Sequence, residues 1–246
     1  MNSMKKLFAV LLFAPTLALA NEEGAKLDSA PVDLANHASL QRGARMFVNY
    51  CLNCHSANYM RYSRLQDLGL TEDEIKENLL FTREKPGETM AVAMTKKDAK
   101  SWFGATPPDL TVIARSRGPD WLFTYLRSFY RDDSRPTGWN NTVFDKVGMP
   151  HVLATLQGEQ IAHFRIEKDH EGNEQHVFDR FELIRPGTVS LAQYDAMVGD
   201  LVNYLAWMGE PAKEKRMTTG IFVLLFLGIF FVVAYYLKKE YWKDVH

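Results

Sequence analysis

The stretch Cys51-Leu52-Asn53-Cys54-His55 decides what this chain can bind and how it must fold around it. It holds the two cysteines of the chain, two residues apart, with a histidine directly after the second. This spacing is the attachment signature of a c-type haem, in which each thiol bonds one vinyl group and the histidine ligates the iron. A zinc site needs more thiols, and a thioredoxin-like redox pair needs a βαβ setting. The motif therefore predicts one covalent haem c on Cys51 and Cys54, with His55 as an iron ligand.

The first twenty residues indicate the compartment in which the haem is attached. Two lysines, Lys5 and Lys6, precede a mostly apolar run, and Ala18-Leu19-Ala20 resembles a small-residue cleavage site. The apolar run is too short for a membrane anchor and is broken by Pro15. We therefore predict a secretory signal peptide at 1–20 and export of the following residues across the inner membrane of a bacterium.

A second apolar run, from Met217 to Leu237, contains no charged residue. As a helix it would extend about 31 Å, enough to cross a hydrocarbon core of about 30 Å. Lysine and arginine are balanced on its two sides, so the signal peptide decides the orientation. We expect a periplasmic domain at 21–212, a juxtamembrane segment and single transmembrane helix at 213–237, and a cytoplasmic tail at 238–246.

Acidic residues dominate the part of the chain that we expect to be exported. Residues 21–212 contain 21 basic and 27 acidic residues, a net charge of −6. Such a charge either keeps the domain soluble or steers a cationic partner towards the haem edge. It argues against nucleic acid as a partner.

Hydrophobic periodicity and turn residues predict a mainly α-helical domain with one hairpin. Ser39 is a plausible N-cap of a first helix that ends at the haem motif, and Thr71 and Glu74 form a capping box. The other expected elements are helices over Thr71–Leu80, Pro119–Tyr130 and Asp195–Trp207, and strands over Ile161–Ile166 and Val177–Ile184 around a turn at 169–173.

Gly43 lies inside the first expected helix, where glycine costs about 1 kcal/mol relative to alanine. Close approach of another helix would offset that cost. Phe47 and either Tyr204 or Trp207 are the aromatic residues that we expect beside such a crossing.

A sixth ligand to the iron can come from methionine or histidine. The candidates are Met60, Met90, Met94, Met149, Met197, Met208, His37, His151, His163, His170 and His176. Gly148 and Pro150 make the loop around Met149 rigid, which suits it to hold a side chain at a metal. Spacing alone favours Met149, with His151 as its main rival, and does not decide between them.

Four motifs in this order resemble the cytochrome c1 family of the bacterial cytochrome bc1 complex (ubiquinol–cytochrome c reductase). They are Gln41-Arg42-Gly43 through Cys51-Leu52-Asn53-Cys54-His55, then Gly104-Ala105-Thr106-Pro107-Pro108-Asp109-Leu110, then Val147-Gly148-Met149-Pro150, and finally Tyr204-Leu205-Ala206-Trp207-Met208-Gly209-Glu210-Pro211 before one membrane helix. The first motif is common to c-type cytochromes, and the other three are more specific.

The resemblance implies a class I cytochrome c-like haem domain with a small β-hairpin insertion and one C-terminal transmembrane helix. It implies that Met149 is the sixth ligand, that the carbonyl of Pro108 accepts the ring N–H of His55, and that Arg117 contacts a haem propionate. Trp121 stands where the family usually has a tyrosine that makes a second propionate contact.

The resemblance further implies electron transfer without bond chemistry of its own. The protein would accept electrons from a Rieske iron–sulfur protein, pass them to a c-type cytochrome, and pack against cytochrome b. One alternative is an anchored cytochrome that serves a terminal oxidase or another dehydrogenase. Another is a haem enzyme or gas sensor with five-coordinate iron, whose ferrous form would bind carbon monoxide readily.

Overall fold

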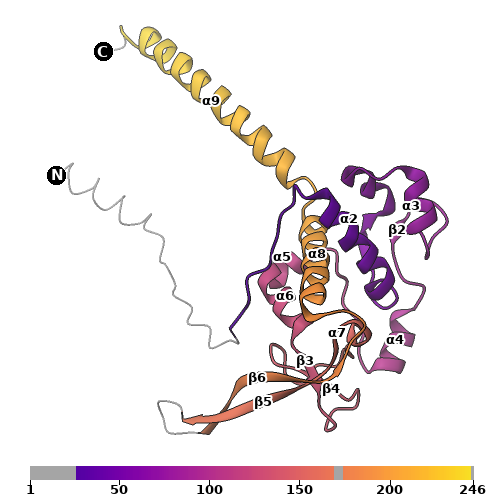
Figure 1. Cartoon of the computed structure of the whole chain (residues 1–246). Helices are drawn as coiled ribbons and strands as arrows, with labels where there is room; N and C mark the ends of the chain where they lie inside the picture. The colour runs from indigo at the N-terminus through magenta and orange to yellow at the C-terminus, as the bar shows by residue number, and fades with distance from the viewer. Residues whose placement is uncertain (1–25, 169–173, 245–246) are drawn as a thin grey trace.

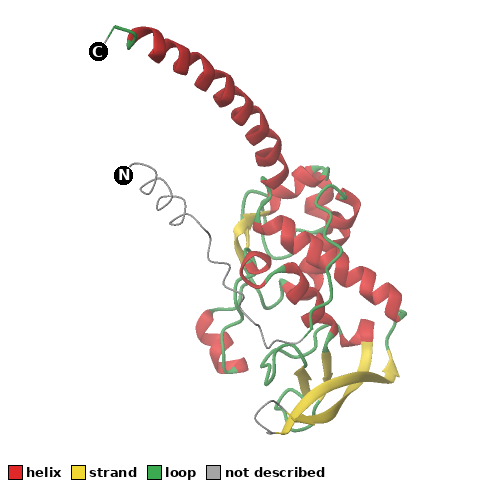
Figure 2. Ribbon diagram, turned by 90° about the vertical axis from the view of Figure 1, so that its left-hand side faces the viewer, coloured by secondary structure: helices red, strands yellow, loops and turns green. Residues whose placement is uncertain are grey.

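The computed structural model describes residues 26–168 and 174–244. A helical body lies in the middle, the long helix α9 projects from one end, and the hairpin of β5 and β6 projects from the other (Figures 1 and 2). About half of the described chain is helical. The signal peptide at 1–20 and the turn at 169–173, both predicted from the sequence, lie outside the described residues.

The helices and strands alternate irregularly along the chain. The helices are α2 (His37–Met46), the π-helical turn η1 (Phe47–Cys51), the 3₁₀ segment η2 (Tyr62–Leu68), α3 (Glu72–Asn78), α4 (Lys96–Phe103), α5 (Ile113–Arg117), α6 (Pro119–Arg127), α7 (Ala154–Gln157), α8 (Leu191–Gly209) and α9 (Lys213–Tyr241). The strands form three antiparallel pairs, β1 (Ala57–Arg61) with β2 (Thr89–Met90), β3 (Phe129–Arg131) with β4 (Trp139–Asn141), and β5 (Gly158–Lys168) with β6 (Glu174–Pro186).

The body is organised around the crossing of α2 and α8. A Cβ atom on Gly43 would lie 2.6 Å from the Cβ of Tyr204 and closer still to the carbonyl oxygen of Asp200. Phe47 and Tyr204 pack beside the crossing with ring centroids 5.6 Å apart, and Arg42 binds the carboxylate of Asp200 through two hydrogen bonds of 2.6 and 2.9 Å. The predicted close approach at Gly43 is thus confirmed.

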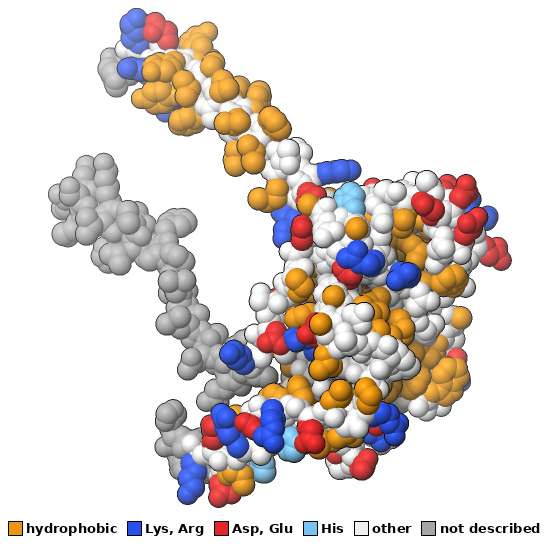
Figure 3. All heavy atoms as spheres, in the orientation of Figure 1, with side chains coloured by type: hydrophobic (Ala, Val, Ile, Leu, Met, Phe, Trp, Pro, Cys, Tyr) orange, Lys and Arg blue, Asp and Glu red, His pale blue; other side chains and the backbone are white. Residues whose placement is uncertain are grey.

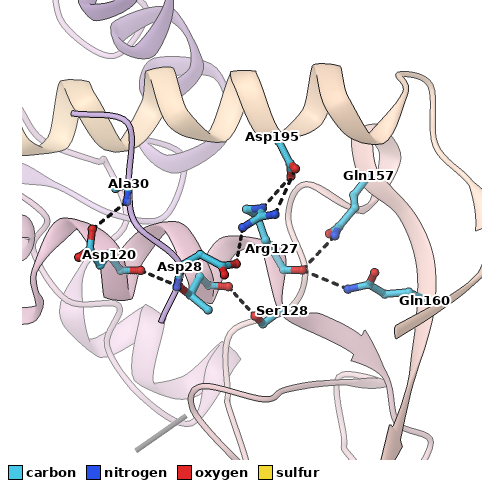
Figure 4. Close-up of polar contacts among 9 residues, drawn as sticks. Asp28, Ala30, Asp120, Arg127, Ser128, Gln157, Gln160 and Asp195 are labelled. Carbon is cyan, nitrogen blue, oxygen red and sulfur yellow. Dashed lines mark hydrogen bonds and ion pairs between the residues drawn. The ribbon is translucent and has the colours of Figure 1, made fainter. Parts of the chain in front are cut away.

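A polar cluster ties the N-terminal segment to α6 and α8 (Figure 4). The guanidinium of Arg127 lies between the carboxylates of Asp28 and Asp195, at 2.6 and 2.7 Å. The backbone carbonyl of Arg127 accepts hydrogen bonds from the side-chain amides of Gln157 and Gln160, both at 3.1 Å. One arginine therefore joins α6 to the N-terminal segment, to α8 and to the base of the hairpin.

Several predicted element boundaries were wrong. Ser39 does not cap α2, because the side chain of Asn36 accepts its backbone N–H at 3.1 Å, and the Ser39 hydroxyl instead accepts from Asn203. The third helix ends at Arg127, three residues before the predicted Tyr130, because Phe129–Arg131 pairs with β4.

Other expectations are confirmed in position, although α3 ends at Asn78, two residues before the predicted Leu80, and α8, β5 and β6 are longer than predicted. The capping box of Thr71 and Glu74 is present at the start of α3. A second capping box, of Ser190 and Gln193, starts α8 four residues before the predicted Asp195. The two predicted strands form the antiparallel pair β5 and β6, and each extends beyond its expected ends.

The helix α9 is long and apolar enough to span a membrane, with a mean hydropathy of 2.6 and none of its residues buried by the described chain. It includes the predicted apolar run and extends past it on both sides. Among the described residues it is the one candidate membrane span.

We predict that Gly43→Ala destabilises the body by about 2–3 kcal/mol, because the added methyl group meets a backbone carbonyl that cannot rotate away. The melting temperature should fall by about 5–10 °C, as measured by far-UV circular dichroism of the detergent-solubilised chain. Gly87→Ala is the control, since a Cβ there meets nothing within 4 Å. Equal melting temperatures for the two variants would contradict the close approach at Gly43.

Candidate haem site

The attachment motif forms one tight turn at the end of the first helix. η1 ends at Cys51, and the backbone carbonyl of Cys51 accepts N–H groups from Cys54 at 3.1 Å and from His55 at 2.8 Å. The two cysteines are not bonded to each other. Burial, with a further contribution from Cys54, raises the pKa of the Cys51 thiol to about 12. Both thiols are unpaired and lie in one turn, so both sulfurs are free for a covalent group.

The ring of His55 is oriented by the loop that contains Pro108. Its Nδ1 atom lies 2.7 Å from the carbonyl oxygen of Pro108, the contact that the family resemblance implies. Because a carbonyl oxygen only accepts, Nδ1 carries the proton and Nε2 is left with a free lone pair. Burial lowers the pKa of His55, although Pro108 and Asp109 oppose the shift. The ring is therefore the neutral imidazole that a metal requires.

Asp109 fixes the loop that carries Pro108. Its carboxylate accepts the backbone and side-chain N–H groups of Asn58 at 2.8 and 2.9 Å, and the backbone N–H and hydroxyl of Thr111 at 2.8 and 2.5 Å. Burial alone would raise the pKa of Asp109, but the hydrogen bonds from Thr111 and Asn58 outweigh it and leave the pKa lowered. An ionised carboxylate thus locks the Pro108 loop to the chain that follows the haem motif.

Met149 lies in a short loop that is held by Asn140. The side-chain oxygen of Asn140 accepts the backbone N–H of Lys146 at 2.9 Å, and Lys146 has a positive φ of 57°. Met149 is half-buried against the core, and its sulfur accepts a hydrogen bond from the hydroxyl of Tyr125 at 3.5 Å. The thioether is thus positioned by two separate elements, the 145–150 loop and α6.

Four of the rival ligands are buried in the core or bonded to another side chain. Met60, Met90 and Met208 are buried in the core, and the sulfur of Met90 accepts from the hydroxyl of Tyr204 at 3.6 Å. His163 binds Glu182 on the hairpin at 2.7 Å. Met94 and Met197 are partly buried, His37 and His176 are exposed, and His170 lies outside the described residues.

His151, the main rival of Met149, is buried among aromatic rings. Its ring stacks on Phe129 at 4.9 Å and meets Trp139 edge-on at 5.0 Å, and its Nε2 has no hydrogen-bond partner within the described part of the chain. Burial lowers the pKa of His151 to about 4, so this ring is neutral as well. The aromatic rings on two sides make it a core side chain, while Met149 sits in the loop outside that stack.

A stack of side chains on α6 joins Arg117 to Met149. The Arg117 guanidinium lies 5.1 Å from the centroid of the Trp121 ring, and Trp121 stacks on Tyr125 at 4.7 Å. Tyr125 in turn reaches the sulfur of Met149. The neighbouring Arg115 lies instead along Gly209 at the end of α8. Sequence reasoning missed Tyr125, although its spacing of four residues from Trp121 places both on one face of a helix.

These side chains fit a haem c. One turn supplies two free thiols and a neutral imidazole with a free Nε2, and a second loop supplies a thioether. Within the parts of the chain that the structure describes, no three His, Cys, Asp or Glu side chains gather as ligands for a bare metal ion. His55 is held by its contact with Pro108, and Met149 is held by its contact with Tyr125. The two candidate iron ligands are therefore positioned by different residues.

Comparison with known proteins places the chain in one family. The model of the Cytochrome C1 family matches residues 28–163 and 184–245. A cytochrome c1 of Allochromatium vinosum is 52% identical over 246 residues, which cover 99% of this chain and all of that protein. A protein of Nitrosomonas europaea named ammonia monooxygenase gamma subunit is 49% identical over the whole of both chains. Cytochrome c1 of Rhodospirillum rubrum is 29% identical over 84% of this chain and 81% of that protein.

The motif turn, the Pro108 loop and the Met149 loop thus belong to a sequence that is half identical to a cytochrome c1 along its full length. The chain therefore belongs to the cytochrome c1 family, whose members carry one covalently bound haem c and carry electrons in respiration as a subunit of the cytochrome bc1 complex.

Proposed function

We propose that this cytochrome accepts single electrons from the Rieske iron–sulfur protein and passes them to a c-type cytochrome acceptor. The observation that carries the proposal is the hydrogen bond from His55 to Pro108, since it leaves one ring nitrogen free and directed by the fold. With Met149 as a second ligand, the iron has no open position for a substrate. This supports electron transfer over the alternative of a five-coordinate haem enzyme or gas sensor.

Each site residue has one task in this proposal. Cys51 and Cys54 would hold the haem covalently, and His55 and Met149 would ligate its iron, which supplies reversible one-electron chemistry when bound. Pro108 keeps the ring of His55 in one orientation and one tautomer. Arg117 offers its guanidinium to a propionate, and Trp121 carries that guanidinium on its ring face instead of making a second polar contact.

The proposed topology follows from the two ends of the chain. As a bc1 subunit the protein is associated with a membrane, and α9 is its candidate span. A signal peptide at 1–20 would place the haem domain at 21–212 on the periplasmic side of a bacterial inner membrane, with the tail at 238–246 in the cytoplasm. The span within 213–237 would then lie beside the anchors of cytochrome b and the Rieske protein.

A second candidate function comes from the relative in Nitrosomonas europaea, whose name assigns it to ammonia monooxygenase. The site geometry does not separate the two assignments, because either complex could use a six-coordinate haem c. The proteins that co-purify with the chain distinguish the two assignments.

We expect the chain, when purified from native membranes in mild detergent, to bring with it a b-type haem subunit and a Rieske protein. Denaturing gels stained for haem should show the covalent colour at the size of this chain. Co-purification with monooxygenase subunits, and without a b-type haem, would contradict the proposal in favour of the second candidate.

Replacing Met149 by leucine should remove the sulfur-to-iron absorption near the red end of the oxidised spectrum. It should also lower the reduction potential by at least about 100 mV, within the ~0.8 V range that axial ligands span, because the ferrous state loses a soft ligand. Met90→Leu is the matched control, since Met90 is buried and its sulfur also accepts from a tyrosine. The opposite pattern in the two variants would show that Met149 is not the ligand.

The hydroxyl of Tyr125 should raise the reduction potential by drawing electron density from the sulfur of Met149. We expect Tyr125→Phe to lower the potential by roughly 20–40 mV, the equivalent of losing one weak hydrogen bond of about 0.5–1 kcal/mol. Potentiometric titration of the haem absorption measures the shift. Tyr59→Phe, at a ring that is 85% exposed, should leave the potential unchanged, and an equal shift in both variants would rule out a specific bond.

Loosening the Pro108 loop should weaken the hydrogen bond to His55 and make the imidazole a poorer donor to ferric iron. Asp109→Asn should therefore raise the reduction potential, although loss of a nearby negative charge acts in the same direction. Thr111→Val separates the two causes, because it removes the hydroxyl that donates to Asp109 and accepts from the backbone N–H of Tyr59, while it keeps the carboxylate. We expect a smaller rise in Thr111→Val; no rise would assign the whole effect to charge.

A further inference from the structure

A groove with a volume of about 270 Å³ opens where α9 leaves the body, and it is called the junction groove below. Figure 1 shows that the end of α8 and the start of α2 lie beside the base of α9 at this point. The groove is lined by residues from three segments, which are Leu34 and His37 at the start of α2, Arg64 and Asp67 on η2, and Trp207 with 210–215 at the link between α8 and α9.

The junction groove lies at the depth of lipid headgroups, given the membrane crossing of α9 that is proposed above and on which this inference rests. The uncharged run of α9 begins at Met217, and Lys213 precedes it by four residues, or about 6 Å along a helix. A bilayer of about 40–45 Å has a hydrocarbon core of about 30 Å, so each headgroup layer is about 5–7 Å thick. The first turn of α9 is therefore level with the phosphates of the leaflet nearest the body.

Two of the three carboxylates in the junction groove already have partners. Asp67 binds Arg64 at 2.7 Å, and both side chains belong to η2. Glu210 binds Arg216 at 2.6 Å, which ties the link to the first turn of α9. The backbone N–H of Lys213 also donates to the carbonyl of Glu210 at 3.1 Å. These contacts fix the shape of the groove and neutralise two of its acids.

The other charged side chains of the junction groove leave one positive charge unbalanced. Lys213, Glu214 and Lys215 are exposed, and none of them makes an ion pair within the residues that the structure describes. Two lysines and one glutamate sum to +1, which the single negative charge of a phosphodiester balances. His37 adds a ring N–H donor at the same groove.

Apolar surface continues from the junction groove along α9. Leu34 and Pro211 are half-buried in its wall, and the ring of Trp207 is buried beneath them. None of the residues of α9 is buried by the described chain, so its apolar run is open directly below the groove. Figure 3 shows charged side chains of both signs around the base of α9 and hydrophobic side chains along it. This sequence of charged and apolar surface matches an amphiphile better than a soluble anion.

We propose that the junction groove binds an anionic phospholipid of the leaflet nearest the body. Lys213 and Lys215 hold the phosphodiester, since ammonium groups near a lipid surface are attracted to anionic headgroups. Glu214 accepts from the hydroxyl groups of a headgroup such as that of phosphatidylglycerol. The acyl chains extend along the uncharged part of α9. The bound lipid then fills the angle between the body and the span.

Titration of phosphatidylglycerol into the full haem-loaded chain, stripped of lipid in mild detergent, tests this site. Native mass spectrometry counts the lipid molecules bound to each chain. We expect Lys213→Gln with Lys215→Gln to weaken the binding of one molecule about 25-fold, or roughly fivefold for each lysine. Lys213→Arg with Lys215→Arg should bind as the unaltered chain does. The control, Lys96→Gln with Lys97→Gln, removes the same charge on α4, away from α9, and should also bind normally (Figure 1). The haem spectrum reports that each variant has folded.

Competing ligands distinguish a lipid from other sources of phosphate. An excess of inorganic phosphate should not displace the lipid, because it has no acyl chains to place along α9. Phosphatidylcholine, which has no net charge, should bind more weakly than phosphatidylglycerol. Displacement by phosphate would assign the groove to a soluble anion, and equal binding of the two lipids would remove the role of the lysines.

Two further results would overturn the inference. One is an equal loss of lipid binding in the glutamine variants of α4 and α9. The other is a lipid that binds the isolated chain but is absent from the complex purified with a b-type haem subunit, which would assign the groove to that subunit. Release of the chain from membranes by alkaline carbonate would instead refute the proposed topology. Co-purification and the haem spectrum test electron transfer separately.

Discussion

The contact between α2 and α8 at Gly43 determines where both halves of the haem site lie. Only a residue without a side chain allows the backbone of α2 to meet the carbonyl of Asp200, and the pair Arg42–Asp200 fastens the helices beside that point. α2 continues into the turn that carries Cys51, Cys54 and His55. α8 in turn packs against α6, which carries Tyr125. The close crossing of α2 and α8 thus brings the turn that carries His55 and the helix that carries Tyr125 into one domain.

Polar groups position the site, and apolar packing holds it together. Asp109 holds the Pro108 loop through four hydrogen bonds, and Asn140 holds the Met149 loop through its side-chain amide. Both are loops between short elements, in which backbone hydrogen bonds alone leave groups unpaired. A side chain that accepts several N–H groups gives such a loop one conformation. This rigidity suits a centre that must change its charge without moving its ligands.

Different parts of the molecule expose surfaces of different chemistry. α9, the candidate membrane span, exposes apolar surface at one end, and the hairpin of β5 and β6 exposes a smaller apolar face at the other. The excess of acidic residues is shared between the body and this hairpin, since residues 158–186 contain seven acidic and four basic residues.

Local sequence features determined much of this protein. The haem motif, the capping box at Thr71, the hairpin strands and the uncharged run of α9 were all readable, because each depends on residues a few positions apart. Gly43 could be marked as the place of a close approach for the same reason. The end of α6 failed because a distant strand competed, since β4 pairs with Phe129–Arg131, whereas the start of α2 failed locally, because Asn36 caps the helix before Ser39.

Only the tertiary structure decided which side chains meet. Tyr125 was not expected at Met149, and Asp109 was not expected to bind Asn58, because these partners are 24 and 51 residues apart in sequence. The position of the hairpin of β5 and β6 at the end opposite α9 was equally beyond the sequence. Hydrophobic periodicity identifies the apolar face of an element, but the partner of that face is set by the packing of the whole chain.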